Sequence, residues 1–154
     1  QWIDNHDAQF GSSADLKIYH NGTHNYFLAT NGDYVFDNGS SELARISQSG
    51  NFTALGTIDS TSDIKLKTNI KTIDNALDKV LQLRGAEYDR IDRDNQHEIG
   101  VIAQEVEKII PEVVHGEDTK TVSYGNMVAV LIEAIKEQNE IINKIKKEIE
   151  ELKG

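Results

Sequence analysis

The sequence contains no cysteine, only one proline and no long apolar run. The absence of cysteine excludes disulfide frameworks, thiol catalysis and thiolate zinc sites. Without about 18 consecutive apolar residues, we expect no helix that spans or inserts into a membrane. Basic residues are scarce, because 16 Lys and Arg stand against 26 Asp and Glu, which gives a formal net charge of -10. This charge would repel nucleic acid and anionic membranes, so we expect neither as a partner.

The first part of the chain, residues 1–61, has the pattern of short β-strands joined by tight turns. Asn-Gly pairs stand at 21–22, 31–32 and 38–39, and such pairs tolerate the positive φ of two-residue hairpin turns. The expected strands are 15–20, 26–28, 34–36, 43–46 and 52–55. Strands this short bury little surface alone, and they would be more stable packed against copies of themselves. The chain begins at Gln1 rather than Met, and we expect it to be a piece of a longer protein.

The second part, residues 62–154, mixes helical and strand patterns, so the expected class is α+β. Apolar residues recur at helical spacing over 73–81, and residues 103–110 read as a helix that Pro111 ends. Strands are expected over 86–91 and 97–102, with a hairpin formed by 112–114 and 121–123. The last element is a long helix over about 124–153.

The long helix carries a narrow apolar seam, with positions alternately three and four residues apart. The seam consists of Val128, Leu131, Ile135, Gln138, Ile142, Ile145, Ile149 and Leu152. Isoleucine at both core positions from Ile142 to Ile149 favours trimers over dimers. The pattern therefore predicts a trimeric coiled coil, which Gln138 interrupts once. The alternative is a single amphipathic helix docked on its own domain.

A serine and a lysine stand five residues apart where the two parts meet. Serine becomes a nucleophile when a base removes its proton, and a lysine that desolvation keeps neutral can be that base. Neither a straight helix nor a strand would bring Ser62 and Lys67 together, so a turn or a second subunit would have to do it. The alternative is a polar linker in which Ser62 is a helix cap or turn residue.

Several motifs around this pair resemble one known family. The run from Ser62 to Ile70, Ser-Asp-Ile-Lys-Leu-Lys-Thr-Asn-Ile, looks like the start of the intramolecular chaperone auto-processing domain of phage tail fibres, tail spikes and endosialidases. Further matches follow in the order of the family, at 100–106, 111–114, 122–124 and 131–136. A segment that begins at Phe10 also resembles one that is frequent in phage fibre proteins.

The resemblance implies a domain that trimerises, helps an upstream β-structured fibre to fold and then releases itself. The implied cut lies between Thr61 and Ser62, with Ser62 as nucleophile and Lys67 as general base. Asp63 would orient Lys67 or hold the turn. Gln104 and Glu105 match another family motif. They could contribute to the site or only support the fold, and we favour support of the fold.

The implied division of the chain is 1–61 as the β-rich end of a fibre and 62–154 as the chaperone domain. The implied partners are two further copies of the chain, which form a homotrimer, and the upstream fibre as folding client. The mature fibre would lie on the virion after assembly in the host cytoplasm, and the chaperone part would be released. This is single-turnover chemistry, for which we expect no cofactor and no metal.

Recognition of a host receptor or glycan is a further expectation for the mature fibre. Aromatic residues of the first part could stack on sugars, although aromatics on short strands more often form core. These are Trp2, Tyr19, Tyr26, Tyr34 and Phe36. His20 and His24 flank the first Asn-Gly turn, but a metal site would need more ligands. The alternative function is a non-catalytic trimerisation or receptor-binding tip, in which Ser62 and Lys67 have no chemical role.

Overall fold

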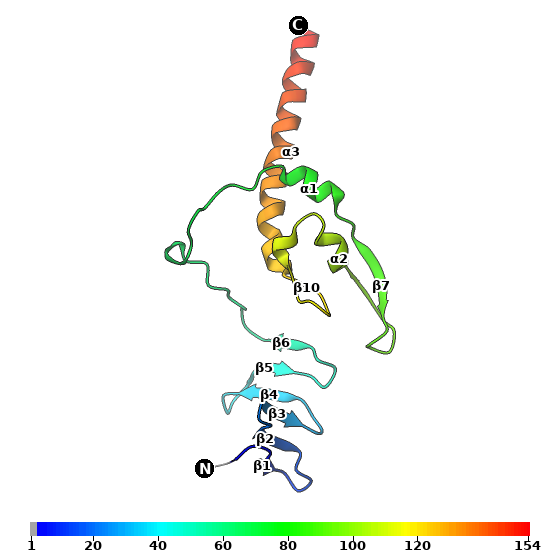
Figure 1. Ribbon diagram of the computed structural model, residues 1–154. Helices are drawn as coiled ribbons and strands as arrows, with labels where there is room; N and C mark the ends of the chain where they lie inside the picture. Colours follow the sequence, from blue (N-terminus) through cyan, green and yellow to red (C-terminus); the bar gives the residue numbers. More distant parts are fainter. Residues whose placement is uncertain (1–2) are drawn as a thin grey trace. The chain divides into compact units, whose positions relative to one another are not determined.

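The computed structural model describes residues 3–154, and the chain divides into two compact units with the boundary between Asp63 and Ile64. The first unit contains short antiparallel strands, whereas the second combines helices with two small antiparallel sheets (Figure 1). The expected α+β class and the long last helix are therefore confirmed. Trp2 lies outside the described residues.

Two three-stranded antiparallel sheets form the first unit. Their strands follow chain order, as β1-β2-β3 and β4-β5-β6. The bounds are β1 Asp7–Phe10, β2 Leu16–His20, β3 Asn25–Ala29, β4 Tyr34–Asp37, β5 Glu42–Ile46 and β6 Phe52–Ala54. The sequence predicted all of these strands except β1, although its four residues alternate between polar and apolar side chains.

The hairpin turns at Asn21 and Asn38 share one geometry. In each turn the asparagine Oδ1 accepts hydrogen bonds from the second and third following amides, at 2.8–3.0 Å. The glycine that follows each asparagine takes a positive φ, of 91° at Gly22 and 89° at Gly39. The hairpin expected at Asn31-Gly32 is wrong, because β3 and β4 belong to different sheets and this turn only connects them.

No side chain among residues 3–63 is buried. Phe27, Phe36, Phe52 and Leu43 remain at least half exposed, although they stand on strands or beside them. Burial of such side chains is the main favourable term in folding. In a single copy, residues 3–63 therefore do not form the hydrophobic core that an independent domain needs.

The second unit contains one long helix, two short ones, two short 3₁₀ helices and two hairpins. The bounds are η1 Ile64–Leu66, α1 Ala76–Gln82, β7 Ala86–Arg90, β8 Gln96–Gly100, α2 Ala103–Val106, η2 Pro111–Val113, β9 Val114–His115, β10 Thr121–Val122 and α3 Tyr124–Lys153. β7 pairs with β8, and β9 pairs with β10. No helix among the described residues is long and apolar enough to cross a membrane.

Helix α2 is shorter than the sequence indicated, because it ends at Val106 rather than at Ile110. A residue before proline avoids the helical region, and Ile110 accordingly has φ -137°. The turns between Val106 and Ile110 are irregular, with the amides of both Ile109 and Ile110 bonded to the Val106 carbonyl. Pro111 then begins η2 instead of only ending a helix.

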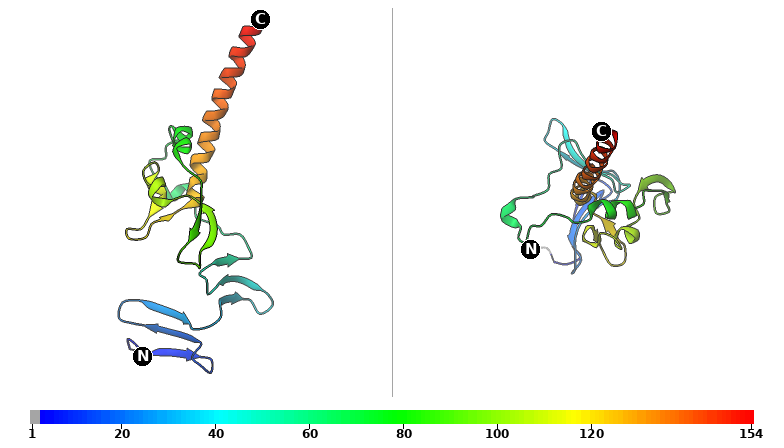
Figure 2. Two further views of the ribbon diagram at one scale, coloured as in Figure 1. Left: turned by 90° about the vertical axis from the view of Figure 1, so that its right-hand side faces the viewer. Right: turned by 90° about the horizontal axis from the view of Figure 1, so that it is seen from above.

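The core of the second unit lies where α1, α2 and η2 meet the first half of α3. Its buried members are Ala76, Val106, Ile110, Val113, Val130 and Ala134. The second half of α3 extends beyond the other elements of this unit (Figures 1 and 2). Its side chains consequently have no packing partner in a single chain.

Glu137 of α3 caps the first turn of α1. Its carboxylate accepts hydrogen bonds from the amides of Leu77, at 2.8 Å, and Ala76, at 2.9 Å. The amides at a helix start have no partner inside the helix, so this contact satisfies them and attaches α1 to α3. These two bonds stabilise the carboxylate and hold the pKa of Glu137 below its ordinary value of 4.5.

We expect Glu137→Gln to lower the melting temperature at neutral pH, because an amide cannot supply two acceptor oxygens. Since the pKa is lower in the folded state, the carboxylate stabilises the fold above pH 4.5 and this contribution is lost as the pH falls through the folded-state pKa. The difference in melting temperature between wild type and variant should therefore shrink in acid. Glu140→Gln on the exposed side of α3 is the control, and an equal loss there would contradict the capping role.

Candidate functional site

The proposed cleavage residues lie in the segment between β6 and α1. Between these elements the chain forms only the single turn of η1, closed by a hydrogen bond of 3.1 Å from the Lys67 amide to the Ile64 carbonyl. Ser62 and Asp63 precede this turn, and Lys67 follows it. The three residues thus flank one turn, and no regular strand or α-helix fixes their separation (Figure 1).

Residues 55–72 of this segment expose several large apolar side chains. These are Leu55, Ile58, Ile64, Leu66 and Ile70, each exposed by more than 60%. Ser62 and Lys67 are also exposed. A lysine acts as a base only where desolvation or a nearby cation keeps it neutral. In a single chain, this segment does not provide the desolvated surroundings that a Ser-Lys pair needs.

Gln104 and Glu105 lie on α2, where Glu105 forms an ion pair with Arg84. The Arg84 Nη2 and Nε atoms donate to its carboxylate at 2.6 Å and 3.1 Å. This pair lowers the pKa of Glu105 and raises that of Arg84. It connects α2 to the residues that lead into β7, whereas the Gln104 side chain is exposed. No sequence pattern indicated Arg84, because its partner is 21 residues away.

The seam of α3 is exposed along its length. Its aliphatic side chains, from Val128 to Leu152, are between 42% and 86% exposed. The helix packs on its own unit through Val130 and Ala134, which are not seam positions. The docked face and the seam are therefore different faces of α3, and docking on its own domain does not account for the seam.

The histidines and aromatic residues of the first unit have local partners. His20 lies 2.9 Å from Asp4, and the rings of Tyr19 and Tyr26 stack with centroids 4.8 Å apart. Among the described residues, no three His, Asp or Glu side chains gather as a metal site would require.

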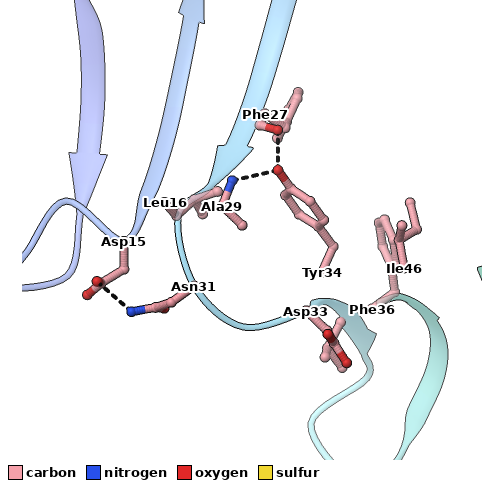
Figure 3. A pocket seen from close by; sticks show the side chains of 10 residues that line it. Asp15, Leu16, Phe27, Ala29, Asn31, Asp33, Tyr34, Phe36 and Ile46 are labelled. Carbon is pink, nitrogen blue, oxygen red and sulfur yellow. Dashed lines mark hydrogen bonds between the residues drawn. The ribbon is translucent and has the colours of Figure 1, made fainter. Parts of the chain in front are cut away.

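Tyr34 and Phe36 line an open cavity of about 830 Å³ between β3 and β4 (Figure 3). The Tyr34 hydroxyl donates to the Phe27 carbonyl and accepts from the Ala29 amide. At the edge of the cavity, the Asn31 side-chain Nδ2 donates a hydrogen bond to the Asp15 carboxylate at 3.0 Å. The tyrosine thus holds the two sheets of the unit together, and the apolar walls of the cavity remain uncovered in one chain.

Part of the second unit is similar to a known family. Residues 62–115 match a peptidase family described as the chaperone of endosialidase. The match confirms the resemblance drawn from the sequence motifs, and residues 62–115 are similar to that family of chaperone domains.

The curated relatives are long tail fibre proteins of phages. The chain is 42% identical to Gp37 of Enterobacteria phage K3 over 49% of its own length, and 41% identical to Gp37 of phage M1 over 55%. Identity to Gp37 of Salmonella phage S16 is 31% over 60% of the chain. The chain spans 7%, 38% and 14% of these three relatives, so it corresponds to a small part of each fibre protein.

Proposed function

We propose that this chain is a trimerisation and folding chaperone of a phage tail fibre that releases itself by cutting between Thr61 and Ser62. The observation that carries the proposal is the family match, which begins at Ser62, the residue that would become the new N-terminus. The three relatives named above are long tail fibre proteins, which supports the upstream fibre as folding client. The mature part would belong to the virion fibre, after assembly in the host cytoplasm.

The proposed reaction transfers the Thr61 acyl group from nitrogen to oxygen. Lys67 removes the proton of the Ser62 hydroxyl, and the Oγ atom attacks the Thr61 carbonyl. The C–N bond breaks as an ester forms, and the proton passes to the freed amine of Ser62. Water then hydrolyses the ester, which leaves a carboxylate on Thr61 and restores the hydroxyl of Ser62. Asp63 would orient Lys67 or hold the turn.

Association of three chains would make the reaction depend on correct assembly. The exposed seam of α3 provides the surface for a parallel trimeric coil, and the coil holds three fibre ends at high local concentration. The exposed segment 55–72 could lose its water only against other copies. Cleavage would then follow assembly, and loss of the chaperone would leave the fibre kinetically trapped.

Substitution of the two nearby lysines tests the assignment of the base. We expect Lys67→Met to slow cleavage by about 10²–10⁴-fold, the usual contribution of a general base. Lys65→Met, which removes the same charge from η1 two residues earlier, should leave the rate close to that of wild type. The rate is measured from the loss of intact chain on denaturing gels. Equal rates for the two variants would refute the role of Lys67.

The alternative, a structural or receptor-binding tip without chemistry, draws support from the first unit, whose exposed aromatic residues could contact a receptor or glycan. It predicts a trimer that stays intact whatever residue stands at position 67. The lysine pair therefore also distinguishes the two functions.

A further inference from the structure

The two flanks of the α3 seam contact different parts of the second unit. On one flank, Val130 and Ala134 are buried against α1. On the other, Ala129 and Ile132 line an open groove of about 350 Å³ together with residues 70–73 of the linker that leads from the cleavage segment. Ile132 is 48% exposed and Ile70 is 63% exposed. The linker thus runs beside the seam, on the side opposite to α1.

The heptad positions of these flanks predict which surfaces of neighbouring copies would be in contact. With Val128 as position a, Ala134 occupies position g and Ile132 occupies position e. In a parallel coiled coil, the e flank of one helix faces the g flank of the next. When three helices close into a ring, every copy presents its e flank to one neighbour and its g flank to the other. The linker flank of each copy then meets the α1 flank of the next.

Charges further along α3 favour this parallel, in-register arrangement. Glu148 occupies position g and Lys153 occupies position e, five residues later, which is the spacing of a pair between parallel neighbours. Neither residue takes part in an ion pair among residues 3–154, whereas neighbouring Lys147 pairs with Glu151 on the same helix. A second copy in register would supply the missing partner for both.

We infer that Ile70 and Ile132 of one copy pack against the α1 flank of a second copy of this chain. The linker is then held between two copies rather than by its own chain alone. This inference rests on the proposed function, since it requires the parallel trimer. It adds that the cleavage segment is anchored at a junction between copies through Ile70, three residues after Lys67.

A photo-crosslinking amino acid, p-benzoylphenylalanine, placed at position 70 tests the inference. The chain should also carry Ser62→Ala so that it stays intact during the experiment. After irradiation, we expect products of twice and three times the chain mass on a denaturing gel. Peptide mapping should place the captured residue in 76–82 or 127–134. The probe at position 132 repeats the test from α3, and the probe at position 91, where Ile91 is 91% exposed, controls for random capture.

The outcomes separate this inference from the proposed function. A trimer by native mass spectrometry that gives only links within one chain, links to other surfaces or no links from positions 70 and 132 would overturn the inference and leave the trimer standing. A chain that is monomeric by native mass would overturn both. Capture of 76–82 or 127–134 from another copy, with none from position 91, would support it.

Discussion

Ser62→Ala should abolish cleavage completely, because alanine has no hydroxyl to attack the Thr61 carbonyl. By residue number, the wild-type chain of 17.2 kDa would divide at this bond into pieces of about 6.8 and 10.4 kDa. The variant should remain a single band under the same conditions. Since a replaced nucleophile leaves no alternative route to the ester, the expected effect is larger than that of removing the base.

Ser60→Ala is the matched control for this experiment. Ser60 is exposed in the same segment and two residues away, so its replacement makes the same chemical change without touching the proposed nucleophile. It should cleave as wild type does. The Ser62 assignment would fail if Ser62→Ala still yielded the two pieces, or if Ser60→Ala alone prevented them.

Ile142→Asn should eliminate trimers and, with them, cleavage. Ile142 is a seam residue in the half of α3 that extends beyond the core of its unit, and it is 42% exposed in one chain. Full burial of an isoleucine side chain contributes about 1.5–3 kcal/mol, and Ile142 is 42% exposed in one chain, so a layer of three would lose about 2–4 kcal/mol. Burial of three asparagine amides adds a further cost, and together these losses weaken association by more than about a hundredfold. Sedimentation and gel assays of one preparation measure assembly and cleavage together.

Ile91→Asn makes the same substitution at a position outside the seam. Ile91 is 91% exposed at the end of the β7–β8 hairpin, and its replacement should leave both trimer and cleavage intact. Dependence of cleavage on assembly would be refuted by an Ile142→Asn chain that is monomeric and still cleaves at the wild-type rate.

Local patterns in the sequence predicted the elements that depend on local forces. Helix α3 follows from a periodic seam that extends over eight positions. The turns at Asn21 and Asn38 follow from asparagine side chains that bond to the next amides of the same turn. In each case the residues that determine the structure are neighbours in the chain.

Contacts between distant residues could not be predicted in this way. The Glu137 cap on α1 joins residues 60 and 61 positions apart. The turn at Asn31-Gly32 has the composition of a hairpin, but its place between two sheets is decided by strand pairing elsewhere. The early end of α2 could have been foreseen in part, since Pro111 already restricts Ile110.

For the candidate site, too, the sequence predicted the local segment but not the contacts that would surround it. Sequence motifs identified the segment around Ser62, and the family match begins at that residue. The surroundings that would desolvate Ser62 and Lys67 are absent from a single chain, because this segment lies exposed along with its apolar neighbours. No local sequence pattern around Ser62 specifies which surface would cover it.

Mass spectrometry of the purified protein tests the central claim most directly, with one spectrum under native conditions and one under denaturing conditions. The account predicts three copies of α3 in the native assembly. Under denaturing conditions it predicts a fragment whose exact mass corresponds to residues 62–154. An intact chain in a native trimer, or a fragment with any other N-terminus, would contradict it.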